Sequence, residues 1–156
     1  MDELTLRLRD EFARLNIERF GGLIQEHSVR FSRRSFRTHG SINFRRKQIR
    51  VSLQLYEQHG WEAVVQTLLH EMTHALLHQE GRRDRHTKLF WAEFKSRGGV
   101  RDKLEVKPVG GFVYACPTCG LEMHRLRKIR HPWRYSCRSC DRRYNPRHRL
   151  YLTEER

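Results

Sequence analysis

One five-residue run in this chain has the residue types and spacing of a hydrolytic zinc site: His70-Glu71-Met72-Thr73-His74. Two histidines four residues apart lie on one face of a helix, so both imidazoles can bind a single zinc ion. Glu71 directly follows the first histidine and is placed to take a proton from a water molecule that zinc activates. The run therefore predicts a catalytic zinc ion held by His70 and His74, with Glu71 as general base. The alternative is a pair of surface histidines beside a glutamate.

A catalytic zinc site needs a third protein ligand and one open position, and three residues could supply that ligand. His78 continues the four-residue spacing, but the helix has rotated by about 40° more at that point, which turns His78 away from His70. His86 lies at the end of the following loop, and Glu93 lies in the helix after it. A reversal of the chain would bring His86 back to the metal. Spacing favours His86 and leaves Glu93 open.

A second metal site is indicated by two Cys-x-x-Cys pairs, Cys116 with Cys119 and Cys137 with Cys140. Each pair can occupy a tight turn and supply two thiolates, which together form a closed tetrahedral zinc site. The chain has 4 cysteines, so none remains for a disulfide elsewhere, which is typical of a reducing compartment. A redox dithiol would need a βαβ context that this region lacks. We therefore expect a structural zinc ribbon and two zinc ions per chain, one catalytic and one structural.

The apolar pattern predicts the elements that carry these residues. Residues 3–20 repeat apolar side chains at helical spacing, and Gly21-Gly22 then ends the helix. Residues 28–55 alternate at mostly two-residue intervals and predict a small antiparallel sheet of about three strands. Residues 61–79 predict a well-buried helix, and a shorter helix follows before Gly98-Gly99. The fold class predicted from this order is α+β.

These motifs resemble the SprT-like domain, which includes the Spartan proteases. The resemblance lies in Leu68-Leu69-His70-Glu71-Met72-Thr73-His74-Ala75 and in His86-Thr87-Lys88-Leu89-Phe90, where Thr87 stands in place of the family's glycine. It extends upstream to an Asn-x-x-x-Phe-Gly turn at residues 16–21 and to the strand Ile49-Arg50-Val51-Ser52. The resemblance covers roughly residues 1–100, and in bacterial members a zinc module often follows.

The resemblance implies a zincin-like helical metalloprotease domain whose zinc is held by His70, His74 and His86, with Glu71 as the base. It also implies a DNA-stimulated endopeptidase that cleaves DNA-bound or DNA-crosslinked proteins. Two alternatives stay open: a DNA- or RNA-binding zinc protein without proteolytic activity, and a metalloprotease that cleaves one regulatory partner. The intact Glu71 favours an enzyme, because a purely structural site has no use for that carboxylate.

The composition divides the chain into two parts joined by a stretch that contains glycine and proline. We expect a metalloprotease domain at residues 1–100, a linker at 101–111 and a zinc-ribbon DNA-binding subdomain at 112–156. No apolar run approaches the ~20 residues of a membrane span, and the acidic N-terminus has no signal-peptide core. The expected location is therefore cytoplasmic, associated with the nucleoid in a prokaryote, with no membrane partner.

The chain is strongly basic, with 32 Lys+Arg against 18 Asp+Glu and a formal net charge of +14. Such an excess attracts nucleic acid through counterion release, so DNA and DNA-bound proteins are the expected partners. No acid interrupts the basic residues between positions 30 and 50, which favours phosphate contact over an ordinary solvated strand face. In the ribbon, basic residues alternate with aromatic ones, a composition suited to single-stranded nucleic acid.

These patterns nominate a specific set of DNA contacts in two regions of the chain. The expected contacts are Arg33, Arg34, Arg37, Arg45, Arg46, Lys47, Trp133 and Arg134. Tyr135 is different, because it precedes Cys137 by two residues and is expected to pack inside the small ribbon core. The ribbon is therefore expected to present Trp133, and to bury Tyr135.

Overall fold

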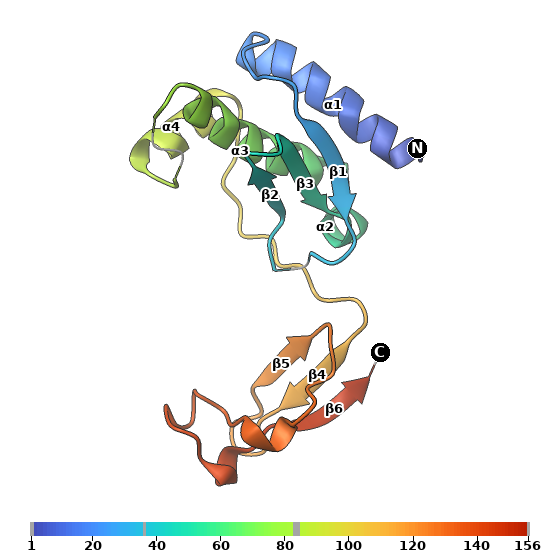
Figure 1. The fold of residues 1–156 in the computed structure, drawn as a ribbon, viewed down its shortest axis with the longest axis vertical. Helices are drawn as coiled ribbons and strands as arrows, with labels where there is room; N and C mark the ends of the chain where they lie inside the picture. The colour runs from blue at the N-terminus through green and yellow to red at the C-terminus, as the bar shows by residue number, and fades with distance from the viewer. Residues whose placement is uncertain (1, 36, 83–84, 156) are drawn as a thin grey trace. The chain divides into compact units, whose positions relative to one another are not determined.

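The computed structural model describes residues 2–35, 37–82 and 85–155. The chain forms two compact units, Met1–Val106 and Lys107–Arg156 (Figure 1). Within the described residues, the first unit contains four α-helices and a three-stranded sheet, and the second contains another three-stranded sheet. The predicted α+β class is confirmed.

The first helix, α1 (Glu3–Phe20), forms because both ends are capped and one face is apolar. Asp2 caps the N-terminus by accepting a hydrogen bond from the backbone N–H of Thr5 at 2.7 Å. At the other end Gly21 adopts the left-handed conformation (φ 59°), which glycine takes without strain. The buried side chains of this helix are Leu8, Phe12, Leu15 and Phe20. The helix predicted at residues 3–20 is confirmed.

The sheet of the first unit comprises β1 (Ser28–Ser32), β2 (Gly40–Asn43) and β3 (Gln48–Ser52), in the order β1-β3-β2 (Figure 1). The predicted antiparallel arrangement holds for β2 and β3, whereas β1 pairs with β3 in parallel. Successive strands do alternate in direction. Because β3 lies between the other two, however, the neighbour of β1 is the strand that runs the same way.

Three helices follow the sheet in the sequence: α2 (Leu53–His59), α3 (Trp61–Gln79) and α4 (Lys88–Ser96). α3 and α4 match the two helices that the apolar pattern predicts. α2 replaces the end of the strand region expected up to residue 55. Ser52 causes this change, because its hydroxyl accepts a hydrogen bond from the N–H of Leu55 at 3.2 Å and caps a helix where β3 ends.

The core of the first unit is organised around α3, which contacts α1, α2, α4, β2 and β3. Leu68 and Met72 of α3 are fully buried, as are Ile49 and Val51 of β3. Removing such side chains from water contributes about 1.5–3 kcal/mol each, so this packing fixes the helix firmly. The helix that carries the histidine pair is therefore held on several sides by the core of the unit.

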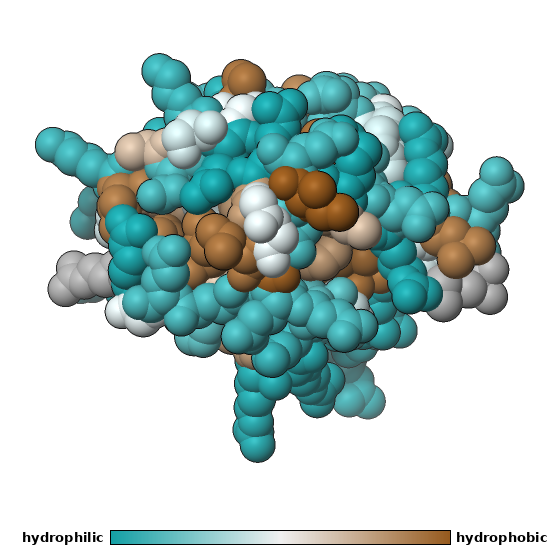
Figure 2. Space-filling model, turned by 90° about the horizontal axis from the view of Figure 1, so that it is seen from above, coloured by the Kyte–Doolittle hydropathy of each residue, from teal (hydrophilic) through white to brown (hydrophobic). Residues whose placement is uncertain are grey.

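Outside this core the protein is largely hydrophilic, as its composition requires. Figure 2 shows a face on which hydrophilic residues dominate and hydrophobic residues gather in a band between them. Hydrophobic residues make up 37% of the chain and charged residues 32%. Some large hydrophobic side chains are exposed, among them Ile17 and Leu23 of the first unit. None of the described helices is long and apolar enough to cross a membrane.

After α4 the chain returns along the first unit in an extended segment, residues 100–106, which we call the strap. The N–H of Val100 donates a hydrogen bond to Gln66 Oε1 at 2.8 Å. His39 Nε2 donates to the carbonyl oxygen of Leu104, also at 2.8 Å. These bonds hold the strap against α3 and the start of β2. The stretch expected as a linker at 101–111 therefore lies partly, as far as residue 106, within the first unit.

The second unit is built on an antiparallel sheet of β4 (Phe112–Ala115), β5 (Glu122–Arg125) and β6 (Tyr151–Glu155), in the order β5-β4-β6. Two short 3-10 turns, η1 (Pro132–Arg134) and η2 (Pro146–His148), lie between β5 and β6. The buried residues of its core cluster are Tyr114, Cys116, Cys137 and Leu150. Such a small core contributes little stability by apolar burial alone.

Candidate metal centres and the active-site cavity

Three histidines from two segments converge at one point in the first unit. α3 places His70 and His74 one turn apart on the same face, and His86 enters from the residues just before α4. The Nε2 atom of His86 is 2.9 Å from that of His70 and 3.1 Å from that of His74. The Nε2 atoms of His70 and His74 are 3.2 Å apart. The structure thus brings together the three residues that the motif and the resemblance nominate.

This triangle of nitrogen atoms fits a metal ion better than a set of hydrogen bonds. Each Nε2 atom either carries a proton or offers a lone pair, so three of them cannot all pair with one another. A tetrahedral zinc ion with bonds of about 2.0–2.1 Å separates its nitrogen ligands by about 3.3 Å, close to the observed spacing. The three donor atoms form a group that could hold a metal ion.

Aromatic surroundings keep the first of these histidines in the form that binds metal. The rings of Phe90, Trp91 and Phe94 lie around His70, at centroid distances of 4.8, 5.7 and 5.6 Å. This burial, together with the two neighbouring histidines, lowers the pKa of His70 to about 3. Its imidazole is therefore neutral at physiological pH, as binding of a cation requires.

The two other candidates for the third ligand are engaged elsewhere. The ring of His78 stacks on Phe44, with centroids 4.0 Å apart and planes 10° apart. The carboxylate of Glu93 lies 3.4 Å from Arg97 and 3.7 Å from Arg82. Neither residue is part of the described histidine group. The geometry therefore favours the loop histidine as the third ligand.

Thr87 stands where the family pattern has glycine, and the structure shows why threonine is tolerated. Its backbone is ordinary and extended (φ −84°, ψ 173°), so no left-handed conformation is needed. Its hydroxyl accepts a hydrogen bond from the N–H of Phe90 at 3.3 Å and caps α4. The cap fixes the start of the helix immediately after His86.

Glu71 lies at the wall of a cavity of about 740 Å³, which the three histidines also line. The residue is only 6% exposed. Burial raises the pKa of its carboxyl group to about 8, because the charged form loses solvation. A buried carboxyl group with a perturbed pKa, in a cavity beside a candidate metal centre, is typical of a catalytic acid or base.

The edge strand β2 approaches Glu71 closely because Gly40 has no side chain. A Cβ atom at this position would lie 2.6 Å from Thr67 Cγ2 and 3.0 Å from Glu71 Oε1. Contacts of this length would force the strand or the helix to shift. Glycine therefore sets how near the backbone of β2 can lie to the carboxyl group.

The strap and α4 form another part of the cavity wall. Trp91 stacks on His86, with centroids 5.4 Å apart and planes 23° apart. The guanidinium of Arg101 lies 4.3 Å from the centroid of the Trp91 ring. Val100, Arg101 and Leu104 of the strap all line the cavity. Sequence reasoning assigns residues 101–111 to a linker and does not single out Trp91, whose position directly after Phe90 is the available signal.

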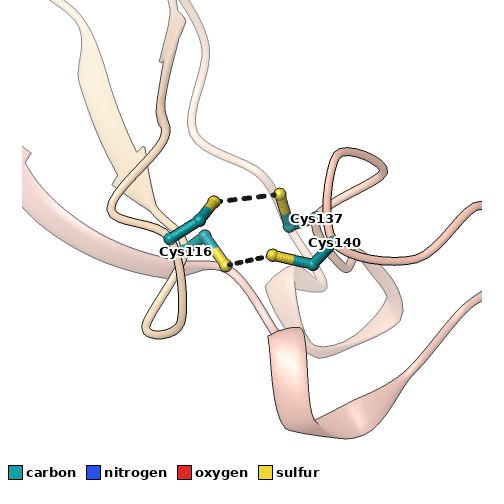
Figure 3. Close-up of side chains that lie close together, drawn as sticks. Cys116, Cys137 and Cys140 are labelled. Atoms are coloured by element: carbon teal, nitrogen blue, oxygen red, sulfur yellow. Dashed lines mark hydrogen bonds between the residues drawn. The ribbon is translucent and has the colours of Figure 1, made fainter.

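The second candidate metal centre lies in the ribbon unit (Figure 3). The Sγ atoms of Cys116 and Cys140 are 3.8 Å apart, and those of Cys119 and Cys137 are 3.7 Å apart. A disulfide would require about 2.05 Å. A tetrahedral zinc ion with Zn–S bonds of about 2.3 Å separates two thiolates by about 3.8 Å. The four free thiols therefore have the spacing of a closed structural zinc site.

The residues expected to contact DNA are exposed and lie in three places. The connection between β1 and β2 carries Arg33, Arg34 and Arg37, the turn between β2 and β3 carries Arg45, Arg46 and Lys47, and η1 of the ribbon carries Trp133 and Arg134. Arg37 also lines the cavity. Tyr135 does not pack inside the ribbon as expected, since it is 46% exposed and the small core is already filled by Tyr114 and Leu150.

Comparison with known proteins assigns the first unit to a family. A family model described as the SprT-like family matches residues 8–108. The chain belongs to the SprT-like family. The match runs from within α1 to just beyond the strap, so it includes Glu71 and the three converging histidines. The family membership supports a metalloprotease-like domain in this part of the chain.

Curated relatives of this SprT-like protein extend the similarity into the second unit. Protein SprT-like from Geobacillus kaustophilus is 29% identical over 148 residues, which are 90% of this chain and 95% of that protein. Protein SprT-like from Staphylococcus aureus (strain MRSA252) is 28% identical over 119 residues, which are 74% of this chain and 78% of that protein. No solved structure matches the chain significantly.

Proposed function

We propose that this SprT-like protein is a zinc-dependent endopeptidase that cleaves DNA-bound or DNA-crosslinked proteins. The observation that carries the proposal is the convergence of three imidazole nitrogens, 2.9 to 3.2 Å apart, in the same cavity as the buried carboxyl group of Glu71. Three protein ligands leave one position of a tetrahedral zinc ion open, which distinguishes a catalytic site from a closed structural one.

The chemistry follows from the residues that face the cavity. His70, His74 and His86 would hold a zinc ion, which would lower the pKa of a water molecule towards about 7 and polarise the peptide carbonyl group. The positive charge of that zinc would favour the ionised form of the Glu71 carboxyl group. Glu71 would then accept one proton of the water as its oxygen bonds to the carbonyl carbon, and would pass that proton to the amine as the C–N bond breaks. Gly40 keeps the backbone of β2 close to this carboxyl group. A site that only bound a structural metal would have no use for Glu71, which favours hydrolysis over binding alone.

The association with DNA is supported by charge and by the surface of the ribbon. The net charge is +14, and the basic residues of the β1–β2 connection and the β2–β3 turn are exposed. In the ribbon, Trp133 is 53% and Tyr144 is 51% exposed. The hydroxyl of Tyr144 donates to the carbonyl of Trp133 at 2.7 Å and accepts from Arg149 Nε at 3.0 Å. Exposed aromatic rings beside a guanidinium suit stacked bases and their phosphates.

Cleavage of a DNA-bound substrate is expected to rise strongly when DNA is present. Enzyme and substrate on one DNA molecule have a raised effective concentration, which increases apparent affinity by about 10²–10⁴-fold. The test is the cleavage rate of a basic DNA-binding protein by the zinc-loaded full chain, with and without single-stranded DNA. A short neutral peptide that does not bind DNA serves as the control substrate, and its cleavage rate should not change.

The same experiment separates the parts of the proposal. Trp133→Ala should reduce the stimulation by DNA and leave cleavage of the neutral peptide unchanged, since Trp133 lies in the ribbon unit. Cleavage of the basic protein that is equally fast without DNA would contradict the DNA-associated role. Equal stimulation of the neutral peptide would contradict the explanation by shared binding.

A further inference from the structure

The outer face of the sheet in the first unit is entirely polar. The register aligns Arg30 of β1 with Arg50 of β3, and Ser41 of β2 with the same Arg50. Aligned residues on neighbouring strands point to the same face, and the alternate positions Ile49 and Val51 point into the core. We call the outward-facing surface the platform. The platform comprises Ser28, Arg30, Ser41, Asn43, Gln48 and Arg50.

The two arginines at the centre of the platform are adjacent like charges. Charges of one sign placed opposite each other on neighbouring strands destabilise a sheet. Arg50 Nε donates a hydrogen bond to Gln48 Oε1 at 3.0 Å, which orients its guanidinium but does not neutralise it. In the described part of the chain, no carboxylate lies within 4.0 Å of Arg30 or Arg50. A bound anion would reduce the electrostatic repulsion between these two arginines.

The platform continues into basic residues at both ends. The turn with Arg45, Arg46 and Lys47 precedes β3 at one end, and Arg33 and Arg34 follow β1 at the other. A five-residue strand spans about 17 Å, which equals the axial rise of about five base pairs of B-DNA. None of the platform residues is aromatic, so the platform lacks the rings on which bases stack in single-strand sites. Its side chains instead match the oxygens of a phosphodiester backbone.

We propose that the platform binds the phosphodiester backbone of nucleic acid, with Arg30 and Arg50 as adjacent phosphate contacts. This inference rests on the proposed association with DNA and assigns it a surface on the first unit. Phosphate contacts carry no sequence information. Binding through the platform is therefore independent of base sequence and accepts duplex DNA, unlike the aromatic surface of the ribbon.

The test measures binding of a short labelled DNA duplex to the full zinc-loaded chain by fluorescence anisotropy, across a salt series. Arg30→Gln and Arg50→Gln should each reduce the slope of log affinity against log salt by about 0.9, the value for one lost phosphate contact. For each variant, the ratio of wild-type affinity to variant affinity should be about 3.5-fold larger at about 50 mM than at about 200 mM salt. Lys95→Gln is the matched control, because it removes the same charge from an exposed position on α4.

A stability measurement separates weaker binding from damage to the fold. Because Arg30→Gln removes one of two like charges, its melting temperature should equal or exceed that of the wild type while its affinity for DNA falls. Platform variants that match Lys95→Gln in affinity and salt slope would overturn the platform inference, even when the wild type binds duplex DNA. A wild type that binds no DNA would overturn the DNA association itself, and cleavage of a peptide by that protein would leave the endopeptidase proposal standing.

Discussion

The variant His86→Ala is expected to lose the catalytic zinc ion and, with it, peptide-bond cleavage. His86 supplies one of only three imidazole nitrogens in the cluster, 2.9 and 3.1 Å from the other two. Loss of an outer-shell partner of a metal ligand already costs about 10–100-fold in affinity or activity, so loss of the ligand itself should exceed 100-fold. The fold should survive, because His86 is exposed and lies outside the core of the first unit.

Zinc content per chain after dialysis and cleavage of a peptide should be measured on the same preparation. The wild type should hold two zinc ions and His86→Ala one, the ion of the ribbon. Glu93→Gln is the control, since Glu93 is the competing candidate for third ligand and the structure places it with Arg97 and Arg82. Loss of the ion in Glu93→Gln but not in His86→Ala would reverse the assignment.

The variant Cys137→Ser is expected to unfold the second unit and leave the first unit active on peptides. Two of the four buried residues in the ribbon core, Cys116 and Cys137, are also candidate zinc ligands, so the core and the metal site cannot be separated. Structural zinc contributes about 10–16 kcal/mol in small zinc domains, far more than so small an apolar core can replace. The first unit has its own core around α3, and none of the residues in that core cluster belongs to the ribbon.

Limited proteolysis followed by mass spectrometry would locate the unfolded part. In Cys137→Ser the cuts should concentrate after residue 107, and zinc content should fall to one ion per chain. Ser139→Ala is a suitable control, because Ser139 is exposed in the same Cys-x-x-Cys turn and bears no ligand atom of the cluster. A protease-resistant second unit with full zinc content in Cys137→Ser would contradict a structural zinc site.

The parts of the fold that the sequence predicts best are those set by local pattern. The helix at 61–79 is fixed by apolar residues at helical spacing, and the α1 helix ends at Gly21 because only its left-handed conformation closes the helix there. The apolar pattern does not predict α2, the helix after β3. A single hydroxyl group, that of Ser52, caps this helix and ends the strand. The pattern also does not predict the parallel pairing of β1 with β3, since alternation identifies strands and not their order in a sheet.

Local pattern also predicts those residues of the candidate site that lie close together in the sequence. His70, Glu71 and His74 share a single helix, and spacing alone groups them. The choice between His86 and Glu93 as third ligand depends on the path of a loop. Spacing favours His86, and the geometry supports the same residue. The role of the strap in the cavity wall could not be read from sequence, because Val100 and Leu104 reach the cavity only through tertiary hydrogen bonds of the segment.

The central claim is that Glu71 transfers the proton in a zinc-dependent cleavage of peptide bonds, and one measurement addresses it directly. Mass spectrometry would count new chain termini formed in a basic, DNA-bound substrate protein by the wild type and by Glu71→Gln, each verified to hold two zinc ions. The amide keeps the shape of the side chain and cannot accept the proton, so the rate should fall by about 10²–10⁴-fold with zinc retained. Cleavage by the zinc-loaded Glu71→Gln variant at the wild-type rate would contradict the proposed mechanism.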